Sequence, residues 1–373
     1  MKKNANIELL RIISMLMVTM LHALGKSGLL VDLSKIGSVS AINSGIGLPN
    51  AWAAWIMEAL SISAVNIFML ISGYFLINSE FKIKRLIEII LQIFIYTAGS
   101  FGAGLLLGVI DKKDVNIYSL LNNFLPVHME VYWFMTAYVV IYICLPLISK
   151  GLNALNEKQH RLMLILLLVY ECVIKSVLPF RLTTDSKGYT FLWYLVVFVA
   201  GAYFRKYGFK VLKSSGRGWA LYFAAAACVV VESFGIRYVI TRFGKLEELG
   251  TMATLEYNNI FVFFEAVGIF AAFINAKPMK ESIGKVICFL SPMALGVYLM
   301  QENFTFRYEW QKWFGLEGAL KEPLYLMLLR IFGAVLAMYA LGTFVDFIRR
   351  VYFEAAMNRS SGASRHLPSK GKS

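Results

Sequence analysis

The chain alternates between long apolar runs and short polar segments, and this alternation predicts an all-α membrane protein. A helix needs about 20 apolar residues to cross the hydrocarbon core of a bilayer, and about ten runs approach that length. These runs lie near residues 7–24, 52–77, 86–110, 131–149, 162–178, 190–204, 219–240, 258–275, 286–303 and 324–348. We expect one ten-span membrane domain over residues 1–353, followed by a basic, disordered tail over residues 354–373.

Composition supports this interpretation, because 58% of the 373 residues are hydrophobic and the mean hydropathy is +0.63, whereas soluble domains are about 45 to 50% apolar. The first run resembles the apolar part of a signal peptide, with small residues at 23–25 that resemble a cleavage site. However, Arg11 interrupts the run and further spans follow it. We therefore expect an uncleaved first helix.

The charge distribution predicts the orientation. If the N-terminus is inside, the inner segments hold about twice as many Lys and Arg residues as the outer loops, as the positive-inside rule requires. This predicts a multi-pass protein of the plasma (cytoplasmic) membrane with both termini in the cytoplasm. Attraction to anionic lipids also explains the net charge of +14 without nucleic acid as a partner. The four cysteines fall inside spans without a CxxC spacing, so no metal site is expected.

Charged residues inside spans are costly and indicate function. In the stretch RIISMLMVTMLHALGK, His22 lies eleven positions after Arg11, or about 1100° of helix, which places both on one face roughly 16 Å apart. Glu8 lies on the same stripe and can pair with Arg11. Simpler roles stay open at this point: Arg11 can snorkel to the headgroups, and His22 can be a satisfied interfacial histidine.

The chemistry of the two side chains, Arg11 and His22, suggests a function for the pair. Neutral imidazole is well suited to take a proton near pH 7, and guanidinium binds phosphates through its fork of donors. A substrate with phosphates at one end and a reactive centre at the other fits the separation of Arg11 and His22. This points to acyl-coenzyme A (acyl-CoA), entering from the cytoplasm, as the donor substrate.

Several motifs together resemble the acyltransferase 3 family of integral membrane acyltransferases, which includes polysaccharide O-acetyltransferases. Arg11 and His22 match its Arg-x10-His signature, and Ser72-Gly73-Tyr74 matches the end of its second-span motif. Segments 81–90, 132–148 and 295–307 are also similar to family segments. The sequence departs from the family where Lys82 replaces an arginine and Asn66 replaces a frequent aspartate.

The resemblance implies a membrane O-acyltransferase that moves an acyl group, expected to be acetyl, from cytoplasmic acyl-CoA to a hydroxyl of a cell-envelope glycan or lipid-linked sugar. It implies that His22 is the catalytic base and that Arg11, Lys82, Lys84 and Arg85 hold the donor. Ser72 and Tyr74 are candidate oxyanion donors. Glu302 either faces acceptor hydroxyls or pairs with a neighbouring helix, with Arg330 among the candidate partners. No permanently bound cofactor is expected.

The alternative is an exporter or transporter of a glycan or small anion, in which Arg11 binds the anion and His22 carries a proton. A transported anion needs basic groups along its whole path. The outer halves of the predicted spans hold only Lys175 and Arg237, both near the surface. This one-sided distribution favours the enzyme.

Overall fold

The computed structural model describes residues 4–32, 35–36, 38, 43–174, 187–243 and 255–363, and over these residues it is helical with no strand. The helices are α1 (Ala5–Lys26), α3 (Leu48–Ala59), α4 (Ala64–Leu76), α5 (Ile83–Leu106), α6 (Ile117–Phe124), α7 (Trp133–Ile143), α8 (Leu145–Ala154), α9 (Glu157–Leu168), α10 (Phe191–Tyr207), α11 (Ser215–Phe243), α13 (Ile260–Ile274), α14 (Glu281–Leu290), α15 (Ala294–Gln301), α16 (Trp310–Trp313) and α17 (Leu324–Ala363). A π-helical turn (Val169–Ile174) and three 3-10 turns, Lys112–Asp114, Ser291–Met293 and Leu316–Lys321, complete the described elements. The predicted all-α class is therefore confirmed.

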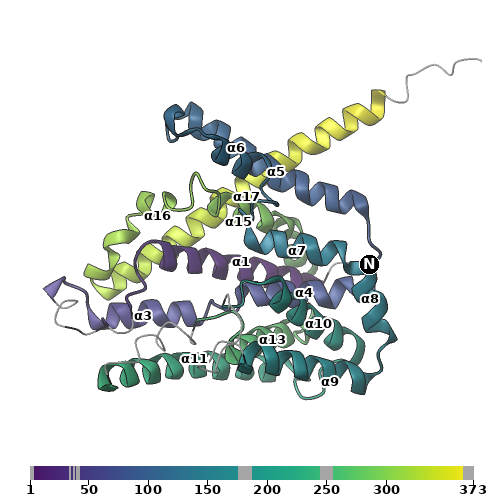
Figure 1. Ribbon diagram of the computed structural model, residues 1–373, viewed down its shortest axis with the longest axis horizontal. Helices are drawn as coiled ribbons and strands as arrows, with labels where there is room; N and C mark the ends of the chain where they lie inside the picture. Colours follow the sequence, from purple (N-terminus) through teal and green to yellow (C-terminus); the bar gives the residue numbers. More distant parts are fainter. Residues whose placement is uncertain are drawn as a thin grey trace, which may run out of the picture.

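Helix α1 lies in the middle of the bundle (Figure 1) and packs against α3, α4, α13, α14, α15 and α17. Its first turn is capped by Asn4, whose side-chain oxygen accepts a hydrogen bond from the backbone N–H of Asn6 at 3.0 Å. Such a cap satisfies one of the free N–H groups at a helix start. The apolar sequence that follows is buried over most of its length, so the polar stripe of α1 faces the protein interior and not the lipid.

Glycines allow two helix pairs to approach closely. A Cβ atom on Gly73 of α4 would overlap the carbonyl oxygen of Phe198 in α10, and one on Gly201 of α10 would overlap the carbonyl oxygen of Leu70. Gly218 of α11 has the same relation to α13. Small residues are typical of such contacts between membrane helices. The motif residue Gly73 is therefore needed for packing.

Among the described residues, six helical segments are long and apolar enough to cross a membrane, or seven if the bent pair α7 and α8 counts as one span. The six segments are Ala5–Lys26, Leu48–Leu76, Ile83–Leu106, Ser215–Val239, Glu281–Gln301 and Leu324–Tyr352. The prediction of ten spans is not confirmed, and the orientation of the termini stays a prediction.

The remaining predicted spans are shorter or broken helices. The segment near 131–149 bends by 62° between α7 and α8, where Pro146 begins the second helix and removes a backbone donor. The segment near 162–178 changes to a π-helical turn after Leu168. Helices α10 and α13 begin at the polar caps Thr190 and Asn259 and have 17 and 15 residues. Apolar run length alone did not reveal these breaks.

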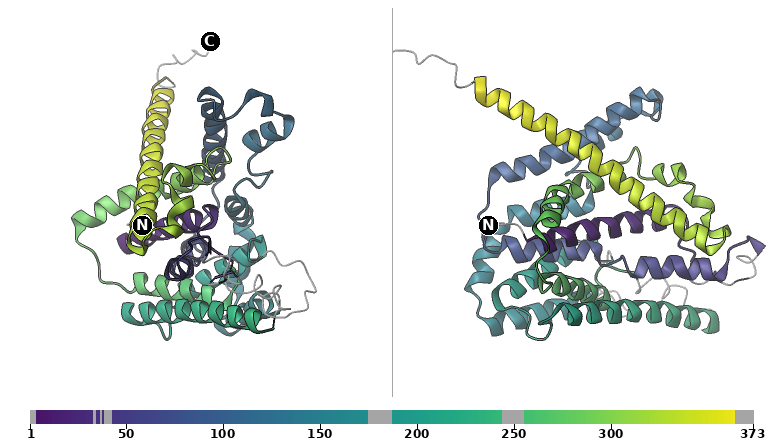
Figure 2. Two further views of the ribbon diagram at one scale, coloured as in Figure 1. Left: turned by 90° about the vertical axis from the view of Figure 1, so that its left-hand side faces the viewer. Right: turned by 180° about the vertical axis from the view of Figure 1, so that it is seen from behind.

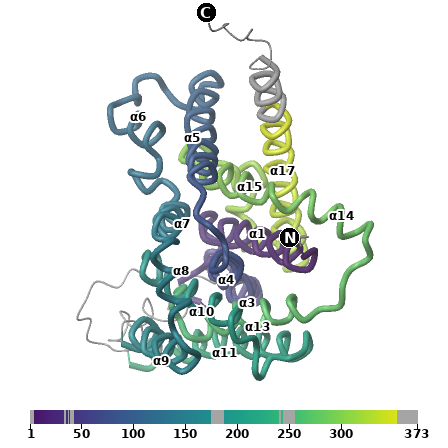
Figure 3. The backbone as a smooth tube through the Cα atoms, turned by 90° about the vertical axis from the view of Figure 1, so that its right-hand side faces the viewer, coloured from purple at the N-terminus to yellow at the C-terminus, as the bar shows by residue number. Residues whose placement is uncertain are grey.

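Helices α5 and α17 cross at one side of the bundle (Figure 2). In each, only 28% of the most apolar window is buried inside the protein, which leaves most of it free to contact lipid. Figure 3 shows α5, α17 and the α14–α15 segment on the same side of α1. The backbone of α17 continues to Ala363, so the predicted tail begins inside this helix, and residues 364–373 lie outside the described residues.

Candidate active site

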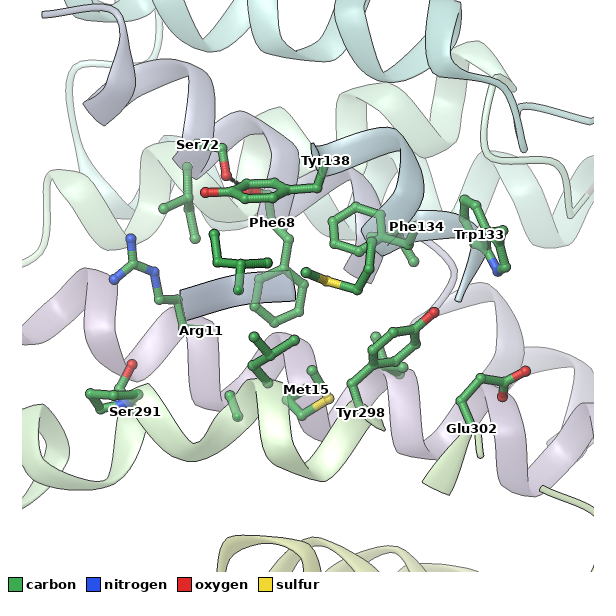
Figure 4. Close-up of a pocket in the computed structure, with 18 of the residues that line it drawn as sticks. Arg11, Met15, Phe68, Ser72, Trp133, Phe134, Tyr138, Ser291, Tyr298 and Glu302 are labelled. Carbon is green, nitrogen blue, oxygen red and sulfur yellow. Dashed lines mark hydrogen bonds between the residues drawn. The ribbon is translucent and has the colours of Figure 1, made fainter. Parts of the chain in front are cut away.

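A cavity of about 1260 Å³ runs beside α1 and is lined by both Arg11 and His22. Its other walls come from α3, α4, α5, α7 and α15 and from the segments before α10 and α13. Figure 4 shows Arg11 and Ser291 on one side of the view and Glu302 and Trp133 on the other. The polar stripe predicted from the sequence therefore faces one continuous space.

One end of the cavity, the His22 end, is formed by His22, Lys26, Glu302 and Arg307. Glu302 Oε2 lies 3.3 Å from His22 Nε2 and also binds the Lys26 ammonium, while Glu302 Oε1 lies 3.0 Å from a guanidinium nitrogen of Arg307. The Glu302 side chain is only 6% exposed. Burial of a carboxylate is costly unless it is paired, and here three basic partners compensate that cost.

The two ring nitrogens of His22 have different surroundings. Nε2 faces Glu302, whereas Nδ1 has no partner within hydrogen-bond distance among the described residues, and the Gln301 side chain also interacts with the ring. Contact with the carboxylate favours the tautomer that carries its hydrogen on Nε2, which leaves the lone pair on Nδ1. Gln311 Nε2 donates to the backbone oxygen of His22 at 3.3 Å. His22 is therefore oriented by contacts to both its ring and its backbone.

Tyr298 of α15 lies next to this histidine, with ring centroids 6.3 Å apart. Its hydroxyl is buried and has no hydrogen-bond partner in the described part of the chain, although it lines the cavity. In Figure 4 the Tyr298 hydroxyl points toward the α7 side of the cavity, where Phe134 and Trp133 lie. An unsatisfied buried hydroxyl is unusual and is available to a bound substrate.

The opposite end, the Arg11 end, is formed by Arg11, Arg85, Arg205 and Arg350. Arg11 donates a hydrogen bond of 2.6 Å to Glu8 Oε1, which is the pair that the sequence allowed. The Ser291 hydroxyl holds the other oxygen of Glu8 at 2.6 Å. The Arg11 side chain keeps 34% of its surface exposed, so it is open to the cavity.

Arg85 and Arg205 at this end face aromatic side chains. An Arg85 nitrogen lies 3.4 Å from the Tyr138 hydroxyl, and Arg205 lies 5.0 Å from the ring centre of Tyr74. Tyr138 interacts electrostatically with both Arg85 and Arg11, which places these two arginines in one cluster. Among the described residues, neither Arg85 nor Arg205 has an ion pair with a carboxylate. Both guanidinium groups are free to bind an anion.

Two of the predicted donor-binding residues do not line the cavity. Lys82 lies just before α5 with an exposed side chain, and Lys84 is 75% exposed and lies 4.0 Å from Glu88. Only Arg85 of the predicted basic segment reaches the cavity wall. Helical periodicity explains the difference, because adjacent positions of α5 point in different directions.

Ser72 and Tyr74, the candidate oxyanion donors, line the cavity away from the His22 end. The Ser72 hydroxyl donates to the Phe68 carbonyl at 2.8 Å, and Figure 4 shows Ser72 on the same side of the view as Arg11. Tyr74 lies under Arg205. This placement separates both residues from His22.

Between its two ends the cavity is apolar. Met15, Phe68, Phe134 and Tyr298 lie between Arg11 and Glu302 in Figure 4, and Val18, Leu21, Ile62 and Val65 also line the space. No Lys or Arg side chain lies among these residues. A ligand that fills the whole cavity must therefore be charged at one end and apolar in its middle.

A family model described as an acyltransferase domain matches residues 4–345 of this chain. The chain belongs to the acyltransferase 3 family. The match includes Arg11, His22 and Glu302, and it confirms the family predicted from the motifs. No curated protein and no solved structure matches the chain. Together with the six spanning segments, the family match identifies a multi-pass membrane acyltransferase.

Lys26 and Arg307 of this acyltransferase were missed as site residues by the sequence analysis. Both follow directly after apolar runs, where basic residues usually mark a membrane interface. The structure places them in the cavity on Glu302, so the His22 end is less poor in basic groups than the sequence analysis expected. Arg237 lies over Trp52, away from the cavity lining, and Lys175 lies outside the described residues.

Asn66 of the acyltransferase, which replaces a frequent aspartate, makes two buried contacts. Its side-chain oxygen accepts a 2.9 Å hydrogen bond from the indole N–H of Trp193, and its amide donates to the Tyr257 carbonyl at 2.8 Å. An aspartate could accept the first bond but could not donate the second. Asn66 therefore positions the segment before α13.

Proposed function

We propose that this acyltransferase transfers an acyl group, acetyl in the simplest case, from cytoplasmic acyl-CoA to a hydroxyl of a cell-envelope glycan or lipid-linked sugar. The main support for this proposal is one continuous cavity. It joins free guanidinium groups at the Arg11 end to the Glu302-bound imidazole at the His22 end. The apolar stretch between them suits the acyl-pantetheine arm of the donor. In this proposal the Arg11 end faces the cytoplasm of the plasma membrane.

The donor is held mainly by Arg11, Arg85 and Arg205. Arginine binds phosphate through two parallel hydrogen bonds, and coenzyme A carries phosphates only at its nucleotide end. Lys82 and Lys84 lie outside the cavity lining. In this proposal their positive charges attract the nucleotide end of the donor toward the cavity. The thioester then extends past Met15 and Phe68 toward His22.

His22 acts as the general base. Nδ1 takes the proton from the acceptor hydroxyl, whose oxygen attacks the thioester carbonyl. The carbon–sulfur bond then breaks, and the coenzyme A thiolate receives the proton from His22. The atoms balance without a metal or cofactor, and the products are the ester and free coenzyme A. Glu302 stabilises the imidazolium that forms during the reaction.

The negative oxygen of the tetrahedral intermediate needs hydrogen-bond donors. We assign this role to the Tyr298 hydroxyl, because it is buried, unpartnered among the described residues and adjacent to His22. Ser72 and Tyr74 lie away from the His22 end and better suit contacts with the donor. Both oxygens of Glu302 are already paired, so its main role is to position His22.

Transfer of label from radioactive acetyl-CoA, added to the cytoplasmic face of inverted vesicles, tests this function. We expect labelled envelope glycan with the native protein and none with His22→Ala. A matched His128→Ala variant, changed at a histidine outside the cavity lining, should retain activity. Absence of label in every vesicle preparation that holds folded native protein would refute the proposal.

An exporter of a glycan or small anion is the second candidate. It is favoured by one observation, the presence of Lys26 and Arg307 at the end opposite Arg11. However, both are paired with the Glu302 carboxylate, and the apolar middle of the cavity offers an anion no basic group. Unlabelled glycan export that persists in His22→Ala vesicles would make the exporter the better hypothesis.

A further inference from the structure

Three aromatic residues from distant parts of the chain form a cluster on the cavity wall: Trp133, Tyr189 and Tyr257. The Trp133 ring lies 4.5 Å from that of Tyr189 and 5.6 Å from that of Tyr257, between centroids. The two tyrosine rings are 4.8 Å apart. We call this cluster the aromatic platform. Tyr189 is 49% exposed, so the platform is accessible from outside the bundle.

The platform is held by specific backbone contacts. The backbone N–H of Tyr257 donates to the carbonyl of Lys187 at 3.1 Å. Gly188, which follows Lys187, has a φ of +79°. A Cβ atom on Gly188 would lie 2.8 Å from the Tyr257 Cβ. Only glycine suits both this conformation and this contact. Asn66 holds the same Tyr257 segment from α4.

A buried carboxyl group lies beside the platform. Glu58, at the end of α3, is only 7% exposed, lines the cavity, and has an Oε2 atom without a hydrogen-bond partner in the described part of the chain. It interacts electrostatically with both Tyr189 and Tyr257. No ion pair of Glu58 is present among the described residues. An unpaired buried carboxyl is costly and indicates a ligand.

The platform also adjoins the His22 end. Tyr189 lines the same cavity as Glu302 and interacts electrostatically with Glu302 as well as with Glu58. In Figure 4, Trp133 is drawn on the same side of the cavity as Glu302. A molecule on the platform therefore lies next to the group that positions the catalytic histidine.

We propose that the aromatic platform and Glu58 form the subsite that binds a pyranose ring of the acceptor. The face of the sugar carries C–H groups that pack on aromatic rings, and Glu58 accepts a hydrogen bond from one ring hydroxyl. Ring centroids only 4.5 to 5.6 Å apart leave no space between the rings for an ammonium group, which disfavours an amine cage. This inference rests on the proposed function and adds the location of the acceptor.

Saturation-transfer NMR of the full-length protein in lipid nanodiscs, without acyl-CoA, tests the subsite directly. The probes are the methyl pyranosides of glucose, galactose, mannose and N-acetylglucosamine, with choline as an amine probe. We expect signal from at least one pyranoside and none from choline. Tyr189→Ala should weaken pyranoside binding about tenfold. The control Tyr325→Ala, at an exposed aromatic position of α17, should leave binding unchanged.

Glu58→Gln tests whether the ligand is a sugar or an amine. Glutamine keeps the size of glutamate and an acceptor oxygen, but it lacks the negative charge that an amine would need. We expect pyranoside binding to weaken by no more than about fivefold. Choline binding that disappears in Glu58→Gln would overturn the sugar assignment, as would the absence of any pyranoside signal from native protein that still binds acetyl-CoA. If the sugar subsite were correct but the proposed function were wrong, pyranosides would still bind and no acetyl group would be transferred.

Discussion

The two ends of the cavity both contain several basic residues, but the residues are used differently. At the His22 end, Lys26, Arg307 and the imidazole all converge on the carboxylate of Glu302. At the Arg11 end, Arg85 and Arg205 contact only aromatic groups among the described residues. In the first cluster the basic groups are held by a carboxylate of the protein, whereas Arg85 and Arg205 in the second cluster have no carboxylate partner among the described residues.

This difference separates positioning from ligand binding. A buried ion cluster whose members pair with one another has fixed geometry and loses much stability if one partner is removed. Unpaired guanidinium groups in a cavity are prepared to bind an anion, and they exchange water for phosphate with little cost to the fold. Substitutions at the His22 end should therefore affect turnover, and substitutions at the Arg11 end should affect affinity for the donor.

The largest expected effect is that of His22→Ala on turnover. Loss of a general base lowers kcat by about 10²- to 10⁴-fold, and the KM for acetyl-CoA should stay within about twofold. Steady-state kinetics in nanodiscs with saturating acceptor measure both values. A large rise in KM with unchanged kcat would instead assign His22 to donor binding.

Tyr298→Phe removes only a hydroxyl and tests the oxyanion assignment. We expect kcat to fall about 100-fold, as for loss of one oxyanion donor, with normal expression and thermal stability. Tyr325→Phe is the matched control at an exposed tyrosine. Wild-type turnover in Tyr298→Phe would remove this residue from the mechanism.

The sequence predicted much of this site because spacing on one helix is a local property. Arg11, His22 and Glu8 share a face of α1 by helical geometry alone, and the structure places Arg11 and His22 on one cavity. Glu302 was singled out as a charge at the end of a span. Its contact with His22 could not be predicted, because that contact depends on how α15 packs against α1.

Other features could not be predicted for physical reasons. Lys26 and Arg307 have the same sequence context as ordinary interfacial residues, and only tertiary packing directs them inward. Tyr189 lies just before α10, at a position that carries no periodic signal. The predicted number of spans also failed to match the described helices, because breaks such as that at Pro146 do not interrupt the apolar pattern.

Glu302→Gln tests whether the His22 end acts by positioning. Glutamine can still accept a hydrogen bond from His22 but cannot neutralise Lys26 and Arg307. We expect kcat to fall roughly 30-fold, equivalent to about 2 kcal/mol, with little change in the KM for acetyl-CoA. Glu309→Gln, at a more exposed ion pair with Lys312, serves as control. If the KM for the acceptor rose and kcat were unchanged, Glu302 would instead be an acceptor contact.

The smallest expected effect is that of Arg85→Ala, which tests the Arg11 end. We expect the KM for acetyl-CoA to rise roughly fivefold, or about 1 kcal/mol for a partly solvated ionic contact, with unchanged kcat. Lys285→Ala is the control, since this 75% exposed lysine does not line the cavity.

The decisive form of this last experiment replaces acetyl-CoA with acetyl-pantetheine, which lacks the phosphates and the nucleotide. Because Arg85 should act only on phosphate, native protein and Arg85→Ala should then have equal kcat/KM. A deficit that persists with acetyl-pantetheine would mean that Arg85 supports the structure of the cavity and does not bind the donor. Equal kcat/KM values with acetyl-pantetheine, together with a raised KM for acetyl-CoA in Arg85→Ala, would mean that the unpaired guanidinium groups of the Arg11 end bind the phosphates of the donor.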